Sequence, residues 1–449
     1  MKRKEFLKTS SALVAGSFLA PMASCNQTAK AARTNWAGNY TYQAEKLHEP
    51  SSVEELQSLV SKLDKQKAVG SRHCFNNIAD SPLNQLSTRK LNKLVKLDEA
   101  AQTVTVEGGI LYGELAPQLH ERGFALHNLA SLPHISVVGG CATATHGSGA
   151  NNTNMAGKVV AIELVTPNGE LVSMDRQHPD FYGSVVSLGA LGIVSRITLE
   201  VEPTFQVRQD LFQNLPLQSA TNHFDAVMSA GYSVSLFTDW QNQEISQVWI
   251  KRRTDQPLEE LGNDFYGATA ATRNLHPITE MSPENCTQQM GEAGPWYERL
   301  PHFKMGFTPS SGDELQSEFF VGRENAVDAL LALEAMKDTI YPQLMISEIR
   351  AVAADQHWMS TCYQRDGIAF HFTWKPNWPE VRKILPKIEA ELSPYAARPH
   401  WGKLFTMEPE VLHSRYSKID DFLALTSQYD PEGKFRNAYL DLNIYRVPV

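Results

Sequence analysis

Residues 131–149 form a run rich in small side chains that suits neither a packed core nor an ordinary surface loop. Four glycines are interspersed there with serine and threonine, and no Asp, Glu, Lys or Arg occurs. Glycine lets the backbone approach a ligand closely and adopt conformations that other residues avoid. A surface loop has no need to exclude charge over such a length. The run therefore predicts a cradle for a bulky ligand.

A second motif, Val-Gly-Ser-Arg-His-Cys-Phe-Asn at 69–76, follows a predicted short strand at 68–70. Gly70 frees backbone N–H groups to face a pyrophosphate, and Ser71 and Arg72 add a donor and a positive charge. Taken alone the motif is a weak signal. A histidine after a strand, such as His73, is more often an ordinary loop residue than a cofactor ligand.

The composition is that of a globular protein of two or three domains. The chain has 449 residues and a net charge of −9, with no basic tract beyond its first residues. Nucleic-acid binding requires clustered Lys and Arg, so we expect no nucleic-acid partner. The five cysteines form no C-x-x-C pair and suggest no disulfide framework, and nothing in their spacing supports a metal site.

The first 25 residues predict an export signal. Basic residues at 2–4 precede an apolar stretch at 11–20 that is too short to span a bilayer. Met-Ala-Ser-Cys at 22–25 then resembles a lipoprotein cleavage box, in which Cys25 takes the lipid. The alternative is a plain secretory signal with an incidental cysteine. The segment 3–8 also resembles a twin-arginine motif, except that Lys4 replaces the second arginine. We expect an exported protein, periplasmic or anchored to a bacterial membrane only by lipid.

Apolar spacing and turn residues predict an α/β pattern from residue 51 onward. A capping box at 51–55 opens a helix to about 65, and a second helix covers 115–122. Hairpins are expected at 94–106 and 159–174, with a strand at 189–201. Further ranges are predicted as amphipathic helices, at 325–337 and 378–392, and as long loops, at 255–300.

Two predicted strands in the second half carry paired polar residues. At 344–350, Glu348 and Arg350 point to the same face, and at 368–374 His371 and Thr373 do the same. Such strands form either one polar wall of a pocket or a solvent-facing sheet with an exposed ion pair, worth under about 1 kcal/mol. The pattern alone leaves both interpretations open.

Together with Gly-Ala-Leu-Gly-Ile-Val at 189–194, the two glycine-containing motifs resemble the FAD-binding domain of the vanillyl-alcohol oxidase superfamily. The segment 126–136 is similar to the alditol oxidases, which act on xylitol and sorbitol. Sugar-lactone oxidases share Thr-His-Gly at 145–147 but usually not Ser-Leu-Pro-His-Ile-Ser. The resemblance implies an α+β fold, with a two-part FAD domain and an antiparallel-sheet substrate (cap) domain. It places the FAD domain at 35–203, the cap at 204–425 and a segment returning to the FAD domain at 426–449.

The resemblance also assigns site residues, with FAD bonded covalently to His73. The residues expected to contact FAD lie in the three motifs: Gly70, Ser71, Arg72, His73, Cys74, Asn76, Ser131, Ser136, Gly139, Gly140, Thr143, Thr145, His146, Gly147, Gly192, Ile193 and Val194. Those expected to bind substrate are Ser131, Glu348, Arg350, His371, Thr373 and Lys403, the last from His-Trp-Gly-Lys at 400–403.

A polyol pocket needs this mixture of donors and acceptors, because each hydroxyl both donates and accepts. Lys403 or Arg350 would stabilise the charge that develops on the substrate oxygen, and His371 or Glu348 would take the proton. We expect oxidation of an alditol's terminal hydroxyl, with O2 reduced to hydrogen peroxide. The alternatives are a sugar-1,4-lactone oxidase or dehydrogenase of the D-arabinono-1,4-lactone or L-gulonolactone type, and a non-catalytic surface lipoprotein that binds carbohydrate.

Overall fold

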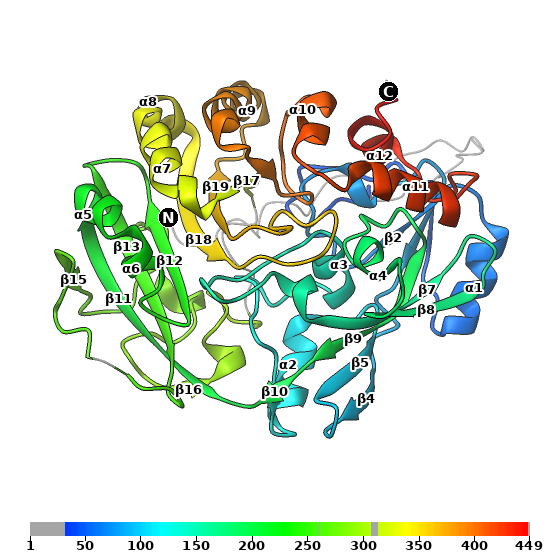
Figure 1. Cartoon of the computed structure of the whole chain (residues 1–449), viewed down its shortest axis with the longest axis horizontal. Helices are drawn as coiled ribbons and strands as arrows, with labels where there is room; N and C mark the ends of the chain where they lie inside the picture. Colours follow the sequence, from blue (N-terminus) through cyan, green and yellow to red (C-terminus); the bar gives the residue numbers. More distant parts are fainter. Residues whose placement is uncertain (1–31, 259, 307–312, 448–449) are drawn as a thin grey trace, which may run out of the picture. The chain divides into compact units, whose positions relative to one another are not determined.

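The computed structural model describes residues 32–258, 260–306 and 313–447. The predicted signal at 1–25, including Cys25, lies outside these residues. From Arg33 onward the chain forms one unit of helices and sheets, in which two sheet systems are joined near β10 (Figure 1). This mixture of elements confirms the predicted α+β class.

Two sheets belong to the first half of the chain. A parallel sheet has the order β1–β3–β2, with bounds Lys46–His48, Asn84–Ser87 and Gln66–Val69. An antiparallel sheet has the order β4–β5–β9–β7–β8, with bounds Leu94–Asp98, Thr103–Glu107, Ile193–Glu200, Val159–Val165 and Leu171–Asp175. Both predicted hairpins and the predicted strand β9 are therefore present. A short ribbon pairs β6 with β10, at Phe124–Ala125 and Glu202–Pro203.

The helices of this half begin at the positions that their caps favour. Helix α1 (Val53–Lys62) starts after Ser52, whose hydroxyl accepts from the Glu55 amide at 3.1 Å. Helix α2 (Tyr112–His120) starts three residues before the predicted 115, because the Glu114 carboxylate accepts from the Leu111 amide at 3.0 Å. Two short helices complete the half, α3 (Val137–Ala142) and α4 (Phe181–Ser184).

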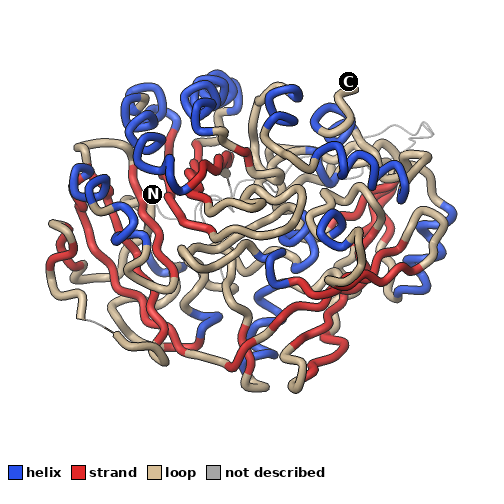
Figure 2. The backbone as a smooth tube through the Cα atoms, in the orientation of Figure 1, coloured by secondary structure: helices blue, strands red, loops and turns tan. Residues whose placement is uncertain are grey.

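The second half is built on a large, mostly antiparallel sheet, whose long strands are conspicuous in Figure 2. Its order is β14–β15–β11–β13–β12–β18–β19–β17–β20, and β16 also pairs with β11. The bounds in that order are Asp264–Phe265, Ala268–Ala270, Gln206–Pro216, Glu244–Arg253, Ser233–Thr238, Leu344–Val352, Gly367–Trp374, Leu315–Gly322, Arg398–Pro399 and Gly294–Pro295. Segment 255–300 is mainly loop with short strands, as predicted.

Helices cover one face of this sheet (Figure 1). They are α5 (Leu217–Asn222), α6 (Phe224–Met228), α7 (Ala326–Ala335), α8 (Lys337–Ile340) and α9 (Trp378–Leu392). Phe370, Phe372 and Trp374 of β19 are buried in the apolar cluster beneath these helices. Because side chains alternate along a strand, the intervening residues of β19 point to the opposite face.

The C-terminal part of the chain packs against the first half. Its helices are α10 (Pro409–Ser414), α11 (Ile419–Tyr429) and α12 (Ala438–Asn443). Lys67 donates from its buried Nζ to the carbonyl oxygens of Leu188, Gly189 and Phe435 at 3.0, 2.9 and 3.2 Å. Met407 and Phe422 already belong to the apolar cluster of the first half. Contact with that half therefore begins before the predicted boundary at 426.

Candidate active site

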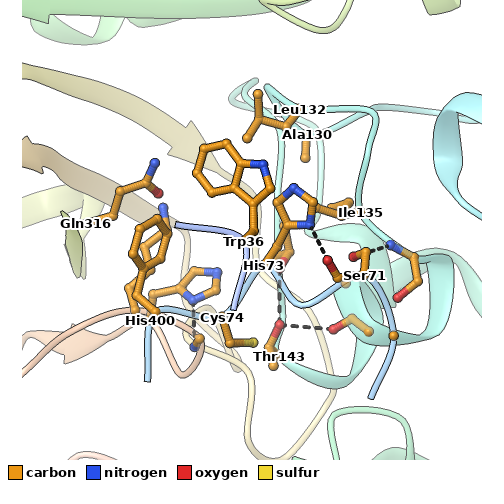
Figure 3. A pocket seen from close by; sticks show the side chains of 18 of the residues that line it. Trp36, Ser71, His73, Cys74, Ala130, Leu132, Ile135, Thr143, Gln316 and His400 are labelled. Carbon is orange, nitrogen blue, oxygen red and sulfur yellow. Dashed lines mark hydrogen bonds between the residues drawn. The ribbon is translucent and has the colours of Figure 1, made fainter. Parts of the chain in front are cut away.

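A cavity connects the loops of the first half to the helix-free face of the large sheet. Loop residues 67–75, 130–146 and 187–194 line one part, and side chains of β17, β18, β19 and the 400–403 loop line the other. Figure 3 shows Trp36, His73 and Ser71 on the loop side, with Gln316 and His400 across the cavity. Almost all predicted contact residues of both groups therefore face one space.

The 69–76 and 131–149 motifs meet at the loop side of this cavity. The Ser71 hydroxyl accepts from the Ser136 amide at 3.1 Å. A Cβ atom at Gly139 would lie 2.6 Å from the Ser136 Oγ, and one at Gly70 would also collide with that oxygen. A Cβ at either position would require the Ser136 hydroxyl to move. The two motifs thus pack closely against each other and form one backbone cradle.

The 189–194 segment closes the cradle from a third side. Gly189 has φ +64° and Gly192 has φ +156°, both in the region that favours glycine. A Cβ at Gly192 would lie 2.5 Å from the Val165 carbonyl oxygen. Ile193 and Val194 follow directly and line the cavity as β9 begins.

His73 presents an unused nitrogen within the cavity lining. Its ring stacks on Trp36, with centroids 5.2 Å apart and an interplanar angle of 17° (Figure 3). Nδ1 lies 3.1 Å from the Ser71 carbonyl oxygen, so it carries the hydrogen, and Nε2 is buried without a partner among the described residues. Burial lowers the pKa of His73 to about 4, so the imidazole is neutral and Nε2 keeps its lone pair.

On the sheet side, neighbouring strands place their polar residues in register. Glu348 of β18 pairs with His371 of β19, which pairs in turn with Glu318 of β17. Arg350 and Thr373 extend the same face, and all five residues are less than a tenth exposed. The prediction of one polar pocket wall is therefore confirmed, and the alternative of a solvent-facing sheet is wrong.

Glu318 lies at the centre of this wall. Its carboxylate accepts from Lys403 Nζ and from an Arg350 guanidinium nitrogen, each at 2.6 Å. His146 Nε2 lies 3.2 Å from the same carboxylate. Arg350 also donates to the Ser131 hydroxyl at 3.3 Å, which links the sheet to the glycine-rich run. Glu318 was not among the predicted site residues, although its alternation with Gln316 follows the pattern that singled out Glu348 and Arg350.

Burial and charge pairing shift the ionisation of this wall. Burial acts to raise the pKa of Glu318, but Lys403, His146 and Arg350 hold it well below its usual range. Burial likewise opposes ionisation of Glu348, whose pKa Arg350 and His302 hold well below its usual value. Burial lowers the pKa of Lys403 while Glu318 counteracts that effect. The wall thus combines two carboxylates with two cations.

His371 lies between the lysine and a threonine. Lys403 Nζ is 2.8 Å from Nδ1, and Nε2 is 3.1 Å from the Thr373 hydroxyl. Burial, reinforced by the nearby Lys403 charge, lowers the pKa of His371 to about 4. The imidazole is therefore neutral near neutral pH, and an ammonium can only donate, so Nδ1 accepts from Lys403.

Two predicted cofactor contacts do not line the cavity. Asn76 donates to the carbonyl oxygens of Trp401 and Lys403, both at 2.8 Å, and so fixes the 400–403 loop. A Cβ at Gly147 would lie 2.5 Å from the Leu129 carbonyl oxygen, which makes this glycine a packing requirement. Both residues therefore hold neighbouring segments of the site in place without lining the cavity. That the others contact FAD or substrate stays a prediction.

Within the described residues, no group of His, Cys, Asp or Glu has a metal-binding arrangement. The described cysteines, Cys74, Cys141, Cys286 and Cys362, are free. The same part of the chain contains no helix of sufficient length and apolar character to cross a membrane.

Comparison with known proteins connects both parts of the site to flavin enzymes. A family model described as an FAD binding domain matches residues 44–175, and one described as D-arabinono-1,4-lactone oxidase matches residues 306–443. The alditol oxidase of a Streptomyces species is 47% identical over 410 residues, which cover 91% of this chain and 97% of that protein. This chain belongs to the alditol oxidase family. It is thus an FAD-dependent oxidase of alcohol groups, and the predicted resemblance is confirmed.

More distant relatives also match over most of this chain. L-gulono-1,4-lactone dehydrogenase of Mycobacterium tuberculosis is 28% identical over 90% of this chain and 97% of that protein. Bovine L-gulonolactone oxidase is 26% identical over 92% and 98%. The crystal structure of cholesterol oxidase from B. sterolicum superposes with a TM-score of 0.75 at 14% identity, covering 92% of this chain and 96% of that one. That likeness concerns the fold, and it confirms the predicted α+β class with a large antiparallel sheet.

Proposed function

We propose that this protein oxidises the terminal hydroxyl of an alditol such as xylitol or sorbitol. The observation that carries the proposal is the cavity that joins the glycine cradle to the polar wall of the large sheet, in a chain 47% identical to an alditol oxidase. Bound FAD would accept a hydride from the carbinol carbon and pass the electrons to O2, giving hydrogen peroxide. The protein supplies binding, orientation and proton transfer.

The cradle suits a flavin nucleotide for three reasons. Its glycines Gly70, Gly139 and Gly192 line the cavity, and glycine lets a backbone approach a ligand closely. Ser71 and Arg72 add a hydroxyl and a positive charge for a pyrophosphate. The buried Nε2 of His73 has no partner within the described part of the chain. These features support FAD in this position, with the ring system toward the sheet.

The wall suits a polyol because it offers both donors and acceptors. Glu348 accepts from substrate hydroxyls, Arg350 and Lys403 donate, and Ser131 and Thr373 do either. Lys403 uses one N–H toward Glu318 and one toward His371. An ammonium has three N–H groups, so among the described contacts one remains for a substrate oxygen. That donor would stabilise the negative charge that grows on the oxygen during hydride loss.

His371 is the better candidate for the base. A substrate hydroxyl that replaces the direct contact between Lys403 Nζ and His371 Nδ1 would accept from the ammonium and donate to the imidazole. Glu348 is the weaker base, because Arg350 and His302 hold its pKa well below its usual range. Its role in the proposal is to bind and orient the substrate.

We further propose that FAD is attached covalently through His73. A neutral imidazole with a buried, unpaired Nε2 is a suitable nucleophile, and stacking on Trp36 holds its ring. Flavin fluorescence should remain with the protein band on a denaturing gel. In His73→Ala the band should be dark although the protein folds. Complete release of yellow flavin from the wild type by acid precipitation would refute the attachment.

The N-terminal segment supports a proposal for localisation. We propose export by residues 1–25 and lipid attachment at Cys25, on the basis of the basic, apolar and Met-Ala-Ser-Cys segments. Mass spectrometry of the protein from its native envelope should find an N-terminal lipidated Cys25. A mature chain that starts elsewhere, or keeps Met1, would refute lipidation.

The decisive experiment uses the protein purified without residues 1–25. Its absorbance spectrum should show bound flavin, and a carbohydrate-binding lipoprotein without catalysis would instead be colourless. Steady-state peroxide release should favour xylitol or sorbitol over an aldono-1,4-lactone. The lactone must be included because residues 306–443 match the family model described as D-arabinono-1,4-lactone oxidase. If the enzyme preferred the lactone to the polyols, the alditol assignment would be overturned. Dye reduction without peroxide would identify a dehydrogenase.

A further inference from the structure

Lys251 is a buried lysine on the same face of the large sheet as the polar wall, and the proposed chemistry does not use it. It lies on β13, is 1% exposed and is not among the residues that line the cavity. Its Nζ lies 2.5 Å and 3.2 Å from the carbonyl oxygens of Leu300 and Pro301, and 3.0 Å from His302 Nδ1. These three acceptors use all three N–H groups of the ammonium.

The contact with Lys251 determines which nitrogen of His302 carries the hydrogen. Burial lowers the pKa of Lys251 to about 7, so the ammonium form is present at and below neutral pH. In that form Nζ has no lone pair, and the ionised Glu348 carboxylate can only accept. Nδ1 must therefore accept, and Nε2 must carry the N–H of the neutral ring. Nε2 lies 2.7 Å from Glu348 Oε1 and therefore donates to it. Glu348 is one of the residues proposed to bind substrate. The lysine thus sets the direction of a hydrogen bond that ends on the active-site carboxylate.

The surroundings of His302 hold its ring in place. Trp249 and Phe237 contact it edge-on, with centroids 5.2 Å and 5.5 Å away. Its backbone amide donates to the Ser131 carbonyl oxygen at 3.1 Å. His302 therefore forms hydrogen bonds both to the Glu348 carboxylate of the sheet and to the glycine-rich run at Ser131.

We propose that Lys251 and His302 are positioning residues that hold the Glu348 carboxylate in one orientation for substrate binding. The proposal deepens the alditol oxidase function and rests on it for the role of Glu348. His302 acts through Glu348, and Lys251 acts through His302.

The charges around His302 agree with this arrangement. The titratable and charged groups near the ring are Lys251, Glu348 and Arg350, with Cys286 on the adjoining segment. Burial, reinforced by Lys251, lowers the pKa of His302 to about 4, so the ring stays neutral near neutral pH. Burial raises the pKa of the Cys286 thiol to about 12, so that group is uncharged. Arg350 and His302 contact Glu348 and favour its ionised form, and His371 on the neighbouring strand adds to that effect.

Substitutions at both positions test the proposal with the flavin-loaded enzyme. His302→Leu removes the donor to Glu348, His302→Gln keeps an N–H of similar reach, and Lys251→Met removes the group that orients the ring. Lys304→Met is the matched control, because Lys304 lies in the same loop but is exposed and donates to the Glu284 carbonyl oxygen.

Two measurements separate positioning from general packing. His302→Leu should raise the KM for the best polyol about tenfold or more, the scale of one hydrogen bond to a charged group, with a smaller change in kcat. His302→Gln should recover most of that loss. Lys251→Met should shift KM in the same direction as His302→Leu, and Lys304→Met should leave it unchanged.

The second measurement does not require a substrate. Infrared spectroscopy reports a protonated carboxyl, and losing the His302 donor raises the pKa of Glu348. Burial raises the pKa values of Asp355 and Glu389 to about 6, so these two carboxyls give bands in every variant at mildly acidic pH. An additional carboxyl band should appear in His302→Leu and vanish in His302→Leu/Glu348→Gln. Wild type and His302→Gln should lack this additional band.

Equal KM values in wild type, His302→Leu and Lys251→Met would overturn the proposal. So would an equal effect of His302→Gln and His302→Leu, since that result indicates packing alone. If the enzyme oxidises no polyol, the proposed function fails, and the infrared comparison still decides whether His302 keeps Glu348 ionised. Should His302→Leu not fold, Lys251→Met and His302→Gln decide the question.

Discussion

Replacing Glu318 by Gln removes the negative charge that Lys403 and Arg350 share at the centre of the polar wall. Each cation has a nitrogen 2.6 Å from the carboxylate, and the residue is 1% exposed. Glutamine keeps the shape and one acceptor oxygen, but its amide group would face the second cation with N–H instead of a lone pair.

The expected loss of stability follows from these contacts. Removing one partner of a buried ion pair costs about 3–5 kcal/mol, because the remaining charge is left uncompensated. Because glutamine retains one acceptor, we expect Glu318→Gln to lower the free energy of unfolding by about 3 kcal/mol, at the lower end of that range. The free energy of unfolding in urea, measured at neutral pH on the flavin-loaded protein, tests this value.

Glu389→Gln is the matched control. Glu389 is also buried, but its carboxylate accepts from the backbone and hydroxyl of Thr406, and no cation of the described residues forms an ion pair with it. Glutamine retains one acceptor there, so the change should cost about 1.5 kcal/mol, the lower end for one hydrogen bond to a charged group. If Glu318→Gln cost no more than Glu389→Gln, the wall would not be organised around a shared charge.

The same variant changes the pH dependence of flavin reduction. The Glu318 charge raises the pKa of Lys403 against the opposing effect of burial. Without that charge the pKa of Lys403 falls further, so the ammonium is lost at lower pH. The decline of the rate on the alkaline side should therefore move to lower pH in Glu318→Gln. If the rate declined at the same alkaline pH in Glu318→Gln and in the wild type, the Lys403 charge would not be needed for the reaction.

Three further predictions follow from the cavity. Lys403→Met should slow flavin reduction about a hundredfold, the scale of one preorganised donor, as measured by anaerobic stopped-flow mixing with excess polyol; a change of only a few-fold would contradict this. His371 must be neutral to accept a proton, and its pKa is about 4, so the reduction rate should stay level from neutral to mildly acidic pH and fall as the pH approaches that value. Trp36→Ala should slow covalent attachment of FAD added to apoprotein, followed as gel fluorescence, because the ring stacked on His73 is lost; attachment at the wild-type rate would remove Trp36 from this role.

Local sequence signals accounted for much of the fold. Helix α1 and the hairpins β4–β5 and β7–β8 follow from a capping box, alternating apolar residues and turn residues, all of which act within a few positions. The same alternation placed Glu348 and Arg350 on one face of β18. Only the register with β19 showed that this face is buried, since strand pairing depends on the whole sheet.

The missed residues depend on contacts between distant segments. Glu318 becomes central because β17 and the 400–403 loop bring Lys403 beside it. His302 follows a loop-rich stretch, and its contact with Glu348 arises only when that loop packs against the face of the sheet that lines the cavity. Conversely, Asn76 belongs to a motif typical of flavin contacts, yet its amide group fixes the 400–403 loop instead.

The buried amine of Lys67 links segments that lie far apart in the sequence. It gathers three carbonyl oxygens, two near residue 188 and one at Phe435, and its side chain lines the cavity. An unpaired polar group in the interior costs free energy, so this amine favours the state in which all three acceptors are in place. The loops that line the cavity and the segment around Phe435 are therefore expected to lose their structure together when the protein unfolds.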